Sequence, residues 1–151
     1  MIEFEGKVSK SVTKHIMRKF LMVGIIVDII VLLLGVSFFV SIGMNWVVSL
    51  IISFSSASIS IVISVCSVKE ALPLRICIED DQTISGTYAN GYGTRKLDQV
   101  KKVIDYGDFY DITFVLLYRW RNCVCQKDLI TQGTIEEFEQ LFEDKIVRKV
   151  K

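Results

Sequence analysis

The longest apolar stretch of this sequence contains one charged residue. Asp28 lies inside a run from Phe20 to Val68 that has no other charge. With a rise of about 1.5 Å per residue, it lies ~12 Å into a bilayer that the chain enters at Phe20. A carboxylate at that depth costs about 2.5–3.5 kcal/mol and needs a partner, a hydrated path or a proton. A hydrogen bond to a serine hydroxyl is the favoured interpretation. A proton or cation site in an oligomer is the alternative.

Serines in the second half of this run can supply such a partner. The small residues that share one helix face, at spacings of three and four, are Ser49, Ser53, Ala57, Ser60 and Ser64. Small side chains at this spacing let membrane helices approach closely, and hydroxyls bond across the interface. Ser53 and Ser60 therefore join Asp28 as a candidate polar site within the membrane. Helix packing explains the pattern, whereas a conduction path lined by these serines requires several copies of the chain.

A tryptophan between two arginines is the second candidate site. Arg119, Trp120 and Arg121 fall at the tip of a predicted β-hairpin. Two guanidinium groups beside an indole suit an anionic lipid or an acidic partner. An ordinary solvated turn near the headgroups is the alternative, and both interpretations stay open.

The other reactive residue types predict no catalysis and no metal or cofactor. Cys123 and Cys125 share one side of a strand, and Cys77 makes a third thiol. The spacing is not the Cys-x2–4-Cys pattern of zinc sites, and His15 is the only histidine. Reduced cysteines packed as small apolar side chains are favoured. Because His15 precedes an apolar span, no Ser-His-Asp triad can be built around it. The prediction is a protein that is not an enzyme.

A membrane hairpin positions the first candidate site. About 20 apolar residues cross a bilayer as a helix, so residues 20–68 predict two spans, 20–42 and 46–68. A cleaved signal peptide is disfavoured because the run is too long and no small-residue cleavage site follows. Residues 1–19 carry five basic and two acidic residues, and the loop between the spans has no charge. The positive-inside rule therefore places both termini in the cytoplasm.

Residues 69–151 predict one small folded domain. The expected strands are Leu72–Glu79, Thr83–Tyr88, Val103–Tyr106, Phe109–Tyr118 and Cys123–Gln126. Residues 89–93 are expected to form a loop. A capping box at Thr134 and Glu137 opens a closing helix whose apolar stripe extends to Ile146. Residues 1–19 are expected to form a strand, Ile2–Val8, that joins this sheet, and then a basic juxtamembrane helix. Antiparallel strands closed by a helix are typical of a pleckstrin-homology-like domain.

The chain resembles the YcxB-like family of small bacterial membrane proteins. The segments that carry the resemblance are Phe109–Leu117, Val124–Leu129 and Gly133–Phe138, with Lys127 where such proteins often have a lysine. Gln126 stands where a proline is common, and Leu97 where an aromatic residue is common. The resemblance implies an α+β membrane protein of the bacterial cytoplasmic membrane, with a two-helix transmembrane hairpin and a cytoplasmic pleckstrin-homology-like domain. It implies no catalytic activity.

The expected function is binding from a membrane anchor. The cytoplasmic domain is expected to bind a protein or lipid partner, in regulation or in immunity against a toxin or bacteriocin. The expected partners are the lipid bilayer and a protein or second copy of this chain. Nucleic acid is not expected, because residues 69–151 carry 13 basic and 14 acidic residues. The alternative function is an oligomeric ion or small-solute conduit that uses Asp28 and the serine-rich second span.

Overall fold

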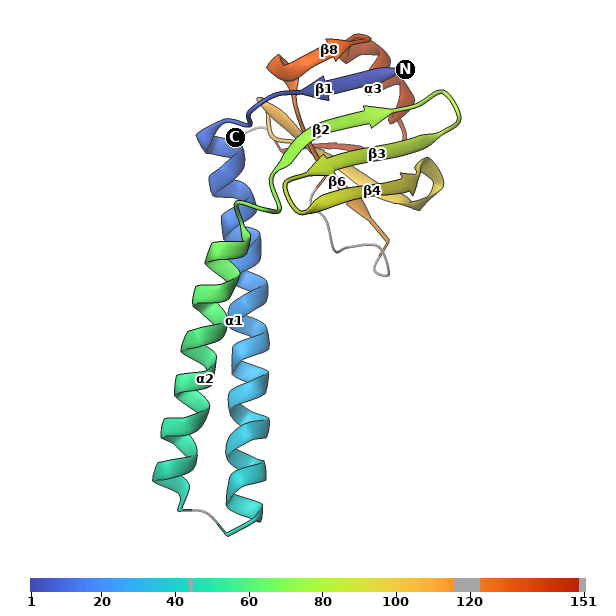
Figure 1. Ribbon diagram of the computed structural model, residues 1–151. Helices are drawn as coiled ribbons and strands as arrows, with labels where there is room; N and C mark the ends of the chain where they lie inside the picture. Colours follow the sequence, from blue (N-terminus) through green and yellow to red (C-terminus); the bar gives the residue numbers. More distant parts are fainter. Residues whose placement is uncertain (44, 116–122, 150–151) are drawn as a thin grey trace. The chain divides into compact units, whose positions relative to one another are not determined.

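The computed structural model describes residues 1–43, 45–115 and 123–149, except for the side chains of 53, 56, 57, 60, 61 and 63–67. The chain divides into two compact units (Figure 1). One unit, here called the helical unit, is His15–Val68. The other, the β unit, combines Met1–Lys14 with Lys69–Lys151. The class is α+β, as the sequence predicts.

Two helices form the helical unit. Helix α1 spans Lys10–Ser41, so its first turn belongs to the β unit, and α2 spans Trp46–Ser67. Between them, Gly43 has a φ of +85°, which glycine adopts without strain, and its N–H bonds the Val40 carbonyl at 3.0 Å. Asn45 caps α2, because its side chain accepts the Val47 N–H at 2.9 Å. The chain therefore reverses direction at the predicted turn.

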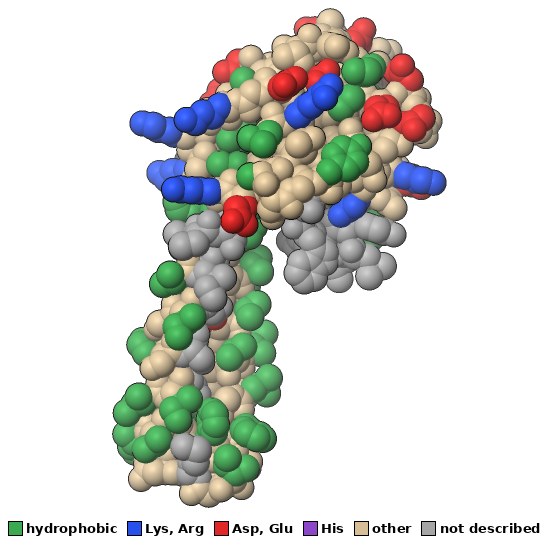
Figure 2. All heavy atoms as spheres, viewed as in Figure 1, with side chains coloured by type: hydrophobic (Ala, Val, Ile, Leu, Met, Phe, Trp, Pro, Cys, Tyr) green, Lys and Arg blue, Asp and Glu red, His purple; other side chains and the backbone are tan. Residues whose placement is uncertain are grey.

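Helix α1 is long and apolar enough to cross a membrane, and it is the one such helix in the described part of the chain. Its apolar side chains are largely uncovered: Leu33 is 60% exposed and Leu34 66%. Figure 2 shows hydrophobic side chains along much of this unit's surface. Exposed apolar surface of this extent is typical of a site of contact with a membrane or with another protein. The second predicted span coincides with a helix, α2.

The β unit contains two sheets. The strands of the first sheet, in spatial order, are β4 (Gly91–Lys96), β3 (Thr83–Tyr88), β2 (Pro73–Ile78), β1 (Ile2–Glu5) and β8 (Ile130–Gln132). Those of the second are β7 (Cys123–Gln126), β6 (Phe109–Phe114), β5 (Val100–Asp105) and β9 (Ile146–Arg148). Helix α3 spans Ile135–Leu141, and short 3-10 turns cover Leu97–Gln99 and Lys127–Leu129.

The predicted joining of the N-terminal strand to the later sheet is confirmed. Strand β1 lies between β2 and β8 and pairs antiparallel with both. Ile2 and Phe4 point into the core, at 6% and 3% exposure, because successive side chains of a strand alternate between faces. The helices are thus inserted into the β unit between its first two strands.

A single apolar core lies between the two sheets and α3. Phe138 and Phe142 are fully buried, and the Phe138 ring stacks on Tyr110 with centroids 4.5 Å apart. Phe4 meets Phe138 edge-on at 5.6 Å. Burial of one such ring contributes about 1.5–3 kcal/mol. The aromatic contacts therefore tie α3 to one strand of each sheet.

The structure differs from the predicted elements in several places. Strand β8 was not predicted, and β1 ends at Glu5 instead of Val8. Residues 91–96, of which 91–93 were expected in a loop, form β4, and a two-residue connection joins it to β3. The closing helix ends at Leu141 and is not the last element, since Ile146 belongs to β9, which pairs parallel with β5. The capping box is confirmed: the Glu137 N–H bonds Thr134 Oγ1 at 3.1 Å, and the Thr134 N–H bonds Glu137 Oε2 at 3.0 Å.

Candidate functional site

The outer face of the five-stranded sheet carries polar side chains that the strand register places in two rows. One row is Glu5, Arg75, Thr87 and Tyr92, and the other is Glu3, Cys77, Ser85 and Thr94. Each row runs across β1, β2, β3 and β4, because directly paired residues of neighbouring strands share a face. The residues between them, such as Ile76 and Ile84, fill the core.

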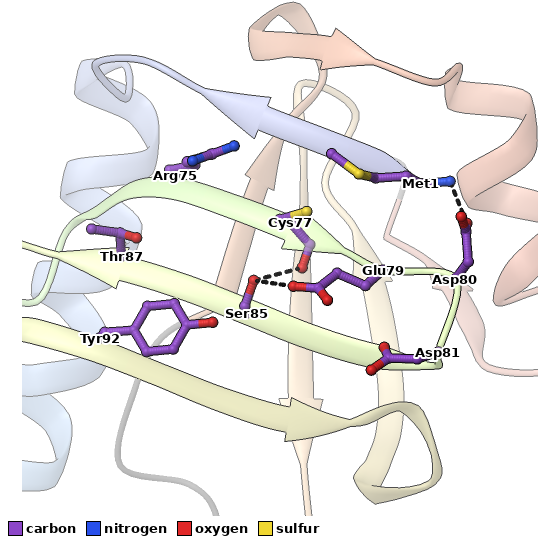
Figure 3. Close-up of a pocket in the computed structure, with 9 residues that line it drawn as sticks. All are labelled: Met1, Arg75, Cys77, Glu79, Asp80, Asp81, Ser85, Thr87 and Tyr92. Atoms are coloured by element: carbon purple, nitrogen blue, oxygen red, sulfur yellow. Dashed lines mark hydrogen bonds and ion pairs between the residues drawn. The ribbon is translucent and has the colours of Figure 1, made fainter.

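A cavity of about 480 Å³ opens on this face (Figure 3). Its lining residues are Met1, Arg75, Cys77, Glu79, Asp80, Asp81, Ser85, Thr87 and Tyr92. We call it the outer cavity. Its volume lies within the range of small-molecule sites, about 300–1,000 Å³. It differs from most of them because most of its lining residues carry polar or charged side chains.

Two cationic groups reach the outer cavity, and carboxylates pair with both. Arg75 Nε donates to Glu3 Oε1, and Glu5 lies 3.9 Å from the same nitrogen. The hydrogen bond to Glu3 raises the pKa of Arg75, so the guanidinium stays charged. The Met1 ammonium lies 2.5 Å from Asp80 Oδ1. Both positive charges are therefore offset by neighbouring acids.

The floor of the outer cavity is a hydroxyl beside a thiol. Ser85 is 6% exposed, and its Oγ donates at 3.4 Å to the Cys77 carbonyl, with Glu79 Oε1 also at 3.4 Å. Both distances exceed the usual O–H···O range of about 2.5–3.0 Å, so the hydroxyl is weakly bonded. Burial raises the pKa of the Cys77 thiol, which therefore remains neutral near pH 7. Tyr92 reaches toward Ser85 from β4 (Figure 3).

A second hollow, of about 470 Å³, lies beside α3 and β9. Glu139 on its wall accepts a hydrogen bond from the Tyr110 hydroxyl at 2.7 Å and pairs with Arg148 at 3.1 Å. Lys127 covers the Tyr110 ring at 4.3 Å and pairs with Asp105 at 3.0 Å. These contacts hold α3 and β9 on the sheet. Because Glu139 and Arg148 on its wall are engaged in these contacts, we assign this hollow a structural role.

The membrane candidate Asp28 faces inward in the helical unit. It is 7% exposed, while its neighbours Val27 and Ile29 are 46% and 54% exposed. No hydrogen bond reaches its Oδ2 within the described structure. The side chains of Ser53 and Ser60 lie outside the described residues, so their grouping with Asp28 stays a prediction.

The described serine hydroxyls of α2 form hydrogen bonds with backbone carbonyls of the same segment. Ser49, Ser55 and Ser58 donate to the carbonyls four residues earlier, at 3.1, 2.8 and 3.0 Å. This local bonding is a common way for serine to sit in an apolar helix. The fully buried Ser49 therefore fills space at the helix contact without using its hydroxyl across it.

The remaining candidate residues from the sequence are either far from one another in the fold or outside the described part of the chain. Arg119, Trp120 and Arg121 lie outside the described residues. Cys123 and Cys125 lie on β7 and are buried in the core between the sheets. Cys77 lies on β2 and lines the outer cavity, on the outer face of the five-stranded sheet. Burial also raises the pKa of Cys125. Among the described residues, no three Cys, His, Asp or Glu side chains are placed to hold a metal ion.

The sequence reasoning missed the outer cavity because it missed β4. The signal was present: Asn90 and Gly91 are residue types typical of hairpin turns, and Tyr92 and Thr94 follow at alternate positions. Gly91 has a φ of +132°, a conformation that favours glycine. Recognition of this turn would have placed Tyr92 on the same face as Arg75.

Comparisons with protein-family models, curated proteins and solved structures found no match for this chain. The resemblance to the YcxB-like family therefore remains a prediction.

Proposed function

We propose that this chain is a non-enzymatic integral membrane protein whose β unit binds a protein or lipid partner. In this proposal residues 20–68 form a two-span anchor in a bacterial cytoplasmic membrane, with both termini in the cytoplasm. The β unit is then a cytoplasmic pleckstrin-homology-like domain of the YcxB-like type. Regulation or immunity against a toxin or bacteriocin is the setting in which such a module would act.

The outer cavity is the observation that carries the binding role. It combines a volume suited to a small ligand or a single side chain with an exposed aromatic residue, Tyr92, and a buried hydroxyl, Ser85. A few placed polar groups around a cavity are what binding sites use to fix orientation. The cavity is built on paired strands, and such elements hold side chains more rigidly than loops do.

The anchor role is supported by the exposure of α1 and by the charge pattern. Only 6% of the most apolar 18-residue segment of α1 is buried, so the protein itself covers little of this segment. Helix α2 follows after a tight turn and has 22 residues, enough for a second crossing. Basic residues in the first turns of α1, ahead of its apolar segment, and after α2 favour a cytoplasmic location for both ends.

Site-specific photo-crosslinking tests the binding role. p-Benzoylphenylalanine replaces Tyr92 in the full-length protein in living bacteria, and Leu141, 42% exposed on α3, is the matched control position. We expect a discrete adduct after irradiation from position 92 and none from position 141. No adduct from position 92, or equal adducts from both positions, would count against binding at the outer cavity.

One observation favours the alternative function, an oligomeric conduit. Asp28 is a buried acid in an apolar helix, and its Oδ2 has no hydrogen-bond partner within the described structure. Intramembrane acids often mark ion paths. Proton and cation flux into liposomes tests this function: a conduit loses flux in Asp28→Asn and keeps it in Ser37→Ala. A monomer in nanodiscs, or no flux from the unaltered protein, eliminates it.

A further inference from the structure

The charges that line the outer cavity leave it acidic. Its two cationic groups, on Arg75 and Met1, are paired with Glu3 and Asp80. Two further carboxylates, Glu79 and Asp81, have no cationic partner among the described residues. Among the described residues, Asp81 accepts one hydrogen bond, from the backbone N–H of Thr83 at 3.0 Å. The cavity thus has unneutralised negative charge and favours a cation.

An aromatic ring stands in the wall of this acidic cavity. Tyr92 is 60% exposed although it lies within a strand and pairs with Thr87. The faces of aromatic rings attract ammonium groups, with a strength of about 0.5–1 kcal/mol at exposed sites. A ring beside carboxylates is the combination that distinguishes an organic cation from a bare metal ion. Among the described residues, no three Cys, His, Asp or Glu side chains are placed to hold a metal ion, which agrees with this distinction.

Hydroxyl groups supply the remaining hydrogen-bond acceptors. The Ser85 hydroxyl is buried in the floor and held only by contacts of 3.4 Å. Thr87 lies beside it on the same face of β3, next to the β4 strand that carries Tyr92. An ammonium group has three N–H donors. A carboxylate and two hydroxyls provide the acceptors that it needs.

We propose that the outer cavity binds an alkylammonium group, held between the Tyr92 ring and the Glu79 and Asp81 carboxylates. This inference rests on the proposed binding role and adds the chemical class of the ligand. The same group occurs at the end of a lysine side chain in a polypeptide and in a free polyamine. The chemistry of the cavity is common to both sources.

Calorimetric titration of the full-length protein in phosphatidylcholine nanodiscs distinguishes the sources. The probes are spermidine and a short capped peptide with two lysines, each titrated at low salt, with empty nanodiscs as the blank. The same peptide with acetylated lysines is the uncharged control and should not bind. Binding of the lysine peptide identifies a polypeptide source, and binding of spermidine identifies a polyamine. Both results support the inference, and no binding of either probe overturns it.

Matched variants test whether binding occurs in the outer cavity. Glu79→Gln and Asp81→Asn should each weaken binding about two- to fivefold. Tyr92→Leu should weaken it by about the same factor, whereas Tyr92→Phe, which keeps the ring, should retain it. Glu143→Gln, an exposed carboxylate of the second hollow, is the control and should change nothing. Unchanged affinity in the double variant Glu79→Gln/Asp81→Asn would overturn the inference.

The two proposals fail in different ways. A photo-adduct at position 92 without binding of either amine probe leaves the binding role intact and refutes the alkylammonium ligand. Amine binding that the Glu79 and Asp81 variants reduce, without any cellular adduct, supports the ligand class and counts against a stable partner in the cell.

Discussion

Arg75 and Glu3 are hydrogen-bonded across β2 and β1, although the whole helical unit separates them in the sequence. The Glu3 side chain is 4% exposed, while that of Arg75 is half exposed. A carboxylate this buried is stable in its charged form only with a partner. The pair therefore fastens the strand before the helices to the strand after them.

Replacement of Arg75 alone should destabilise the β unit more than replacement of both Arg75 and Glu3. Arg75→Met leaves the Glu3 carboxylate buried without its guanidinium and should lower the melting temperature of the β unit. The double variant Glu3→Gln/Arg75→Met should recover part of that loss, because the unpaired charge is gone. Thermal unfolding followed by hydrogen exchange of the β1 and β2 amides measures both. Lys101→Met, at an exposed position, is the control, and an equal loss there would contradict the expectation.

Phe138 should be the most costly core position to truncate. It is fully buried and its ring contacts Phe4, Tyr110 and Phe142. Phe138→Ala should reduce the free energy of unfolding of the β unit by about 3–5 kcal/mol, a large part of the stability of a small domain. Pulse proteolysis in urea measures the change. Leu141→Ala on the same helix, 42% exposed, should cost far less.

Tyr110 should make the β unit sensitive to alkali. Burial and the hydrogen bond to Glu139 raise the pKa of its hydroxyl above the ordinary value of 10.0. The unfolded chain therefore loses this proton first, so the stability present at neutral pH falls as the pH rises past about 10. Tyr110→Phe should cost about 0.5–1.5 kcal/mol at pH 7 and flatten the alkaline decline. A decline of unchanged steepness in Tyr110→Phe would assign it to other groups.

The arginine–tryptophan segment offers a separate test of lipid or acidic-partner binding. Arg119→Glu with Arg121→Glu should abolish capture if the guanidinium groups bind anionic headgroups. Binding of phosphatidylglycerol vesicles by the detergent-purified full-length protein is the measurement, with Lys101→Glu/Lys102→Glu as a matched charge reversal on β5. Equal loss in both double variants would point to net charge instead of this segment.

Local patterns were sufficient to predict the elements whose contacts are themselves local. The Thr134–Glu137 capping box and the turn at Gly43 depend on residues a few positions apart, and both are present. The alternation of Ile2 and Phe4 with Glu3 also sufficed to predict a strand that joins the later sheet. In each case the side-chain pattern and the backbone requirement agree.

The errors occurred where distant pairing overrides local periodicity. Ile146 continues the spacing of the α3 stripe, but the helix ends at Leu141. The chain then pairs with β5, where the Val103 N–H bonds the Lys145 carbonyl at 2.9 Å. The outer cavity depends on the register of four strands, and no single segment encodes it. Tyr92 and Arg75 become neighbours of one site only through that register.

The position of β1 makes folding of the β unit depend on the helices. Since β1 precedes α1 and β2 follows α2, the β1–β2 pair closes a loop that contains both helices. The reversal at Gly43 brings the two ends of that loop to the same side, which reduces the entropy lost on closure. Glu3 and Glu5, which engage Arg75 beside the outer cavity, come from β1. The carboxylates that hold Arg75 at the outer cavity are therefore in place only in molecules in which β1 has paired with β2 across both helices.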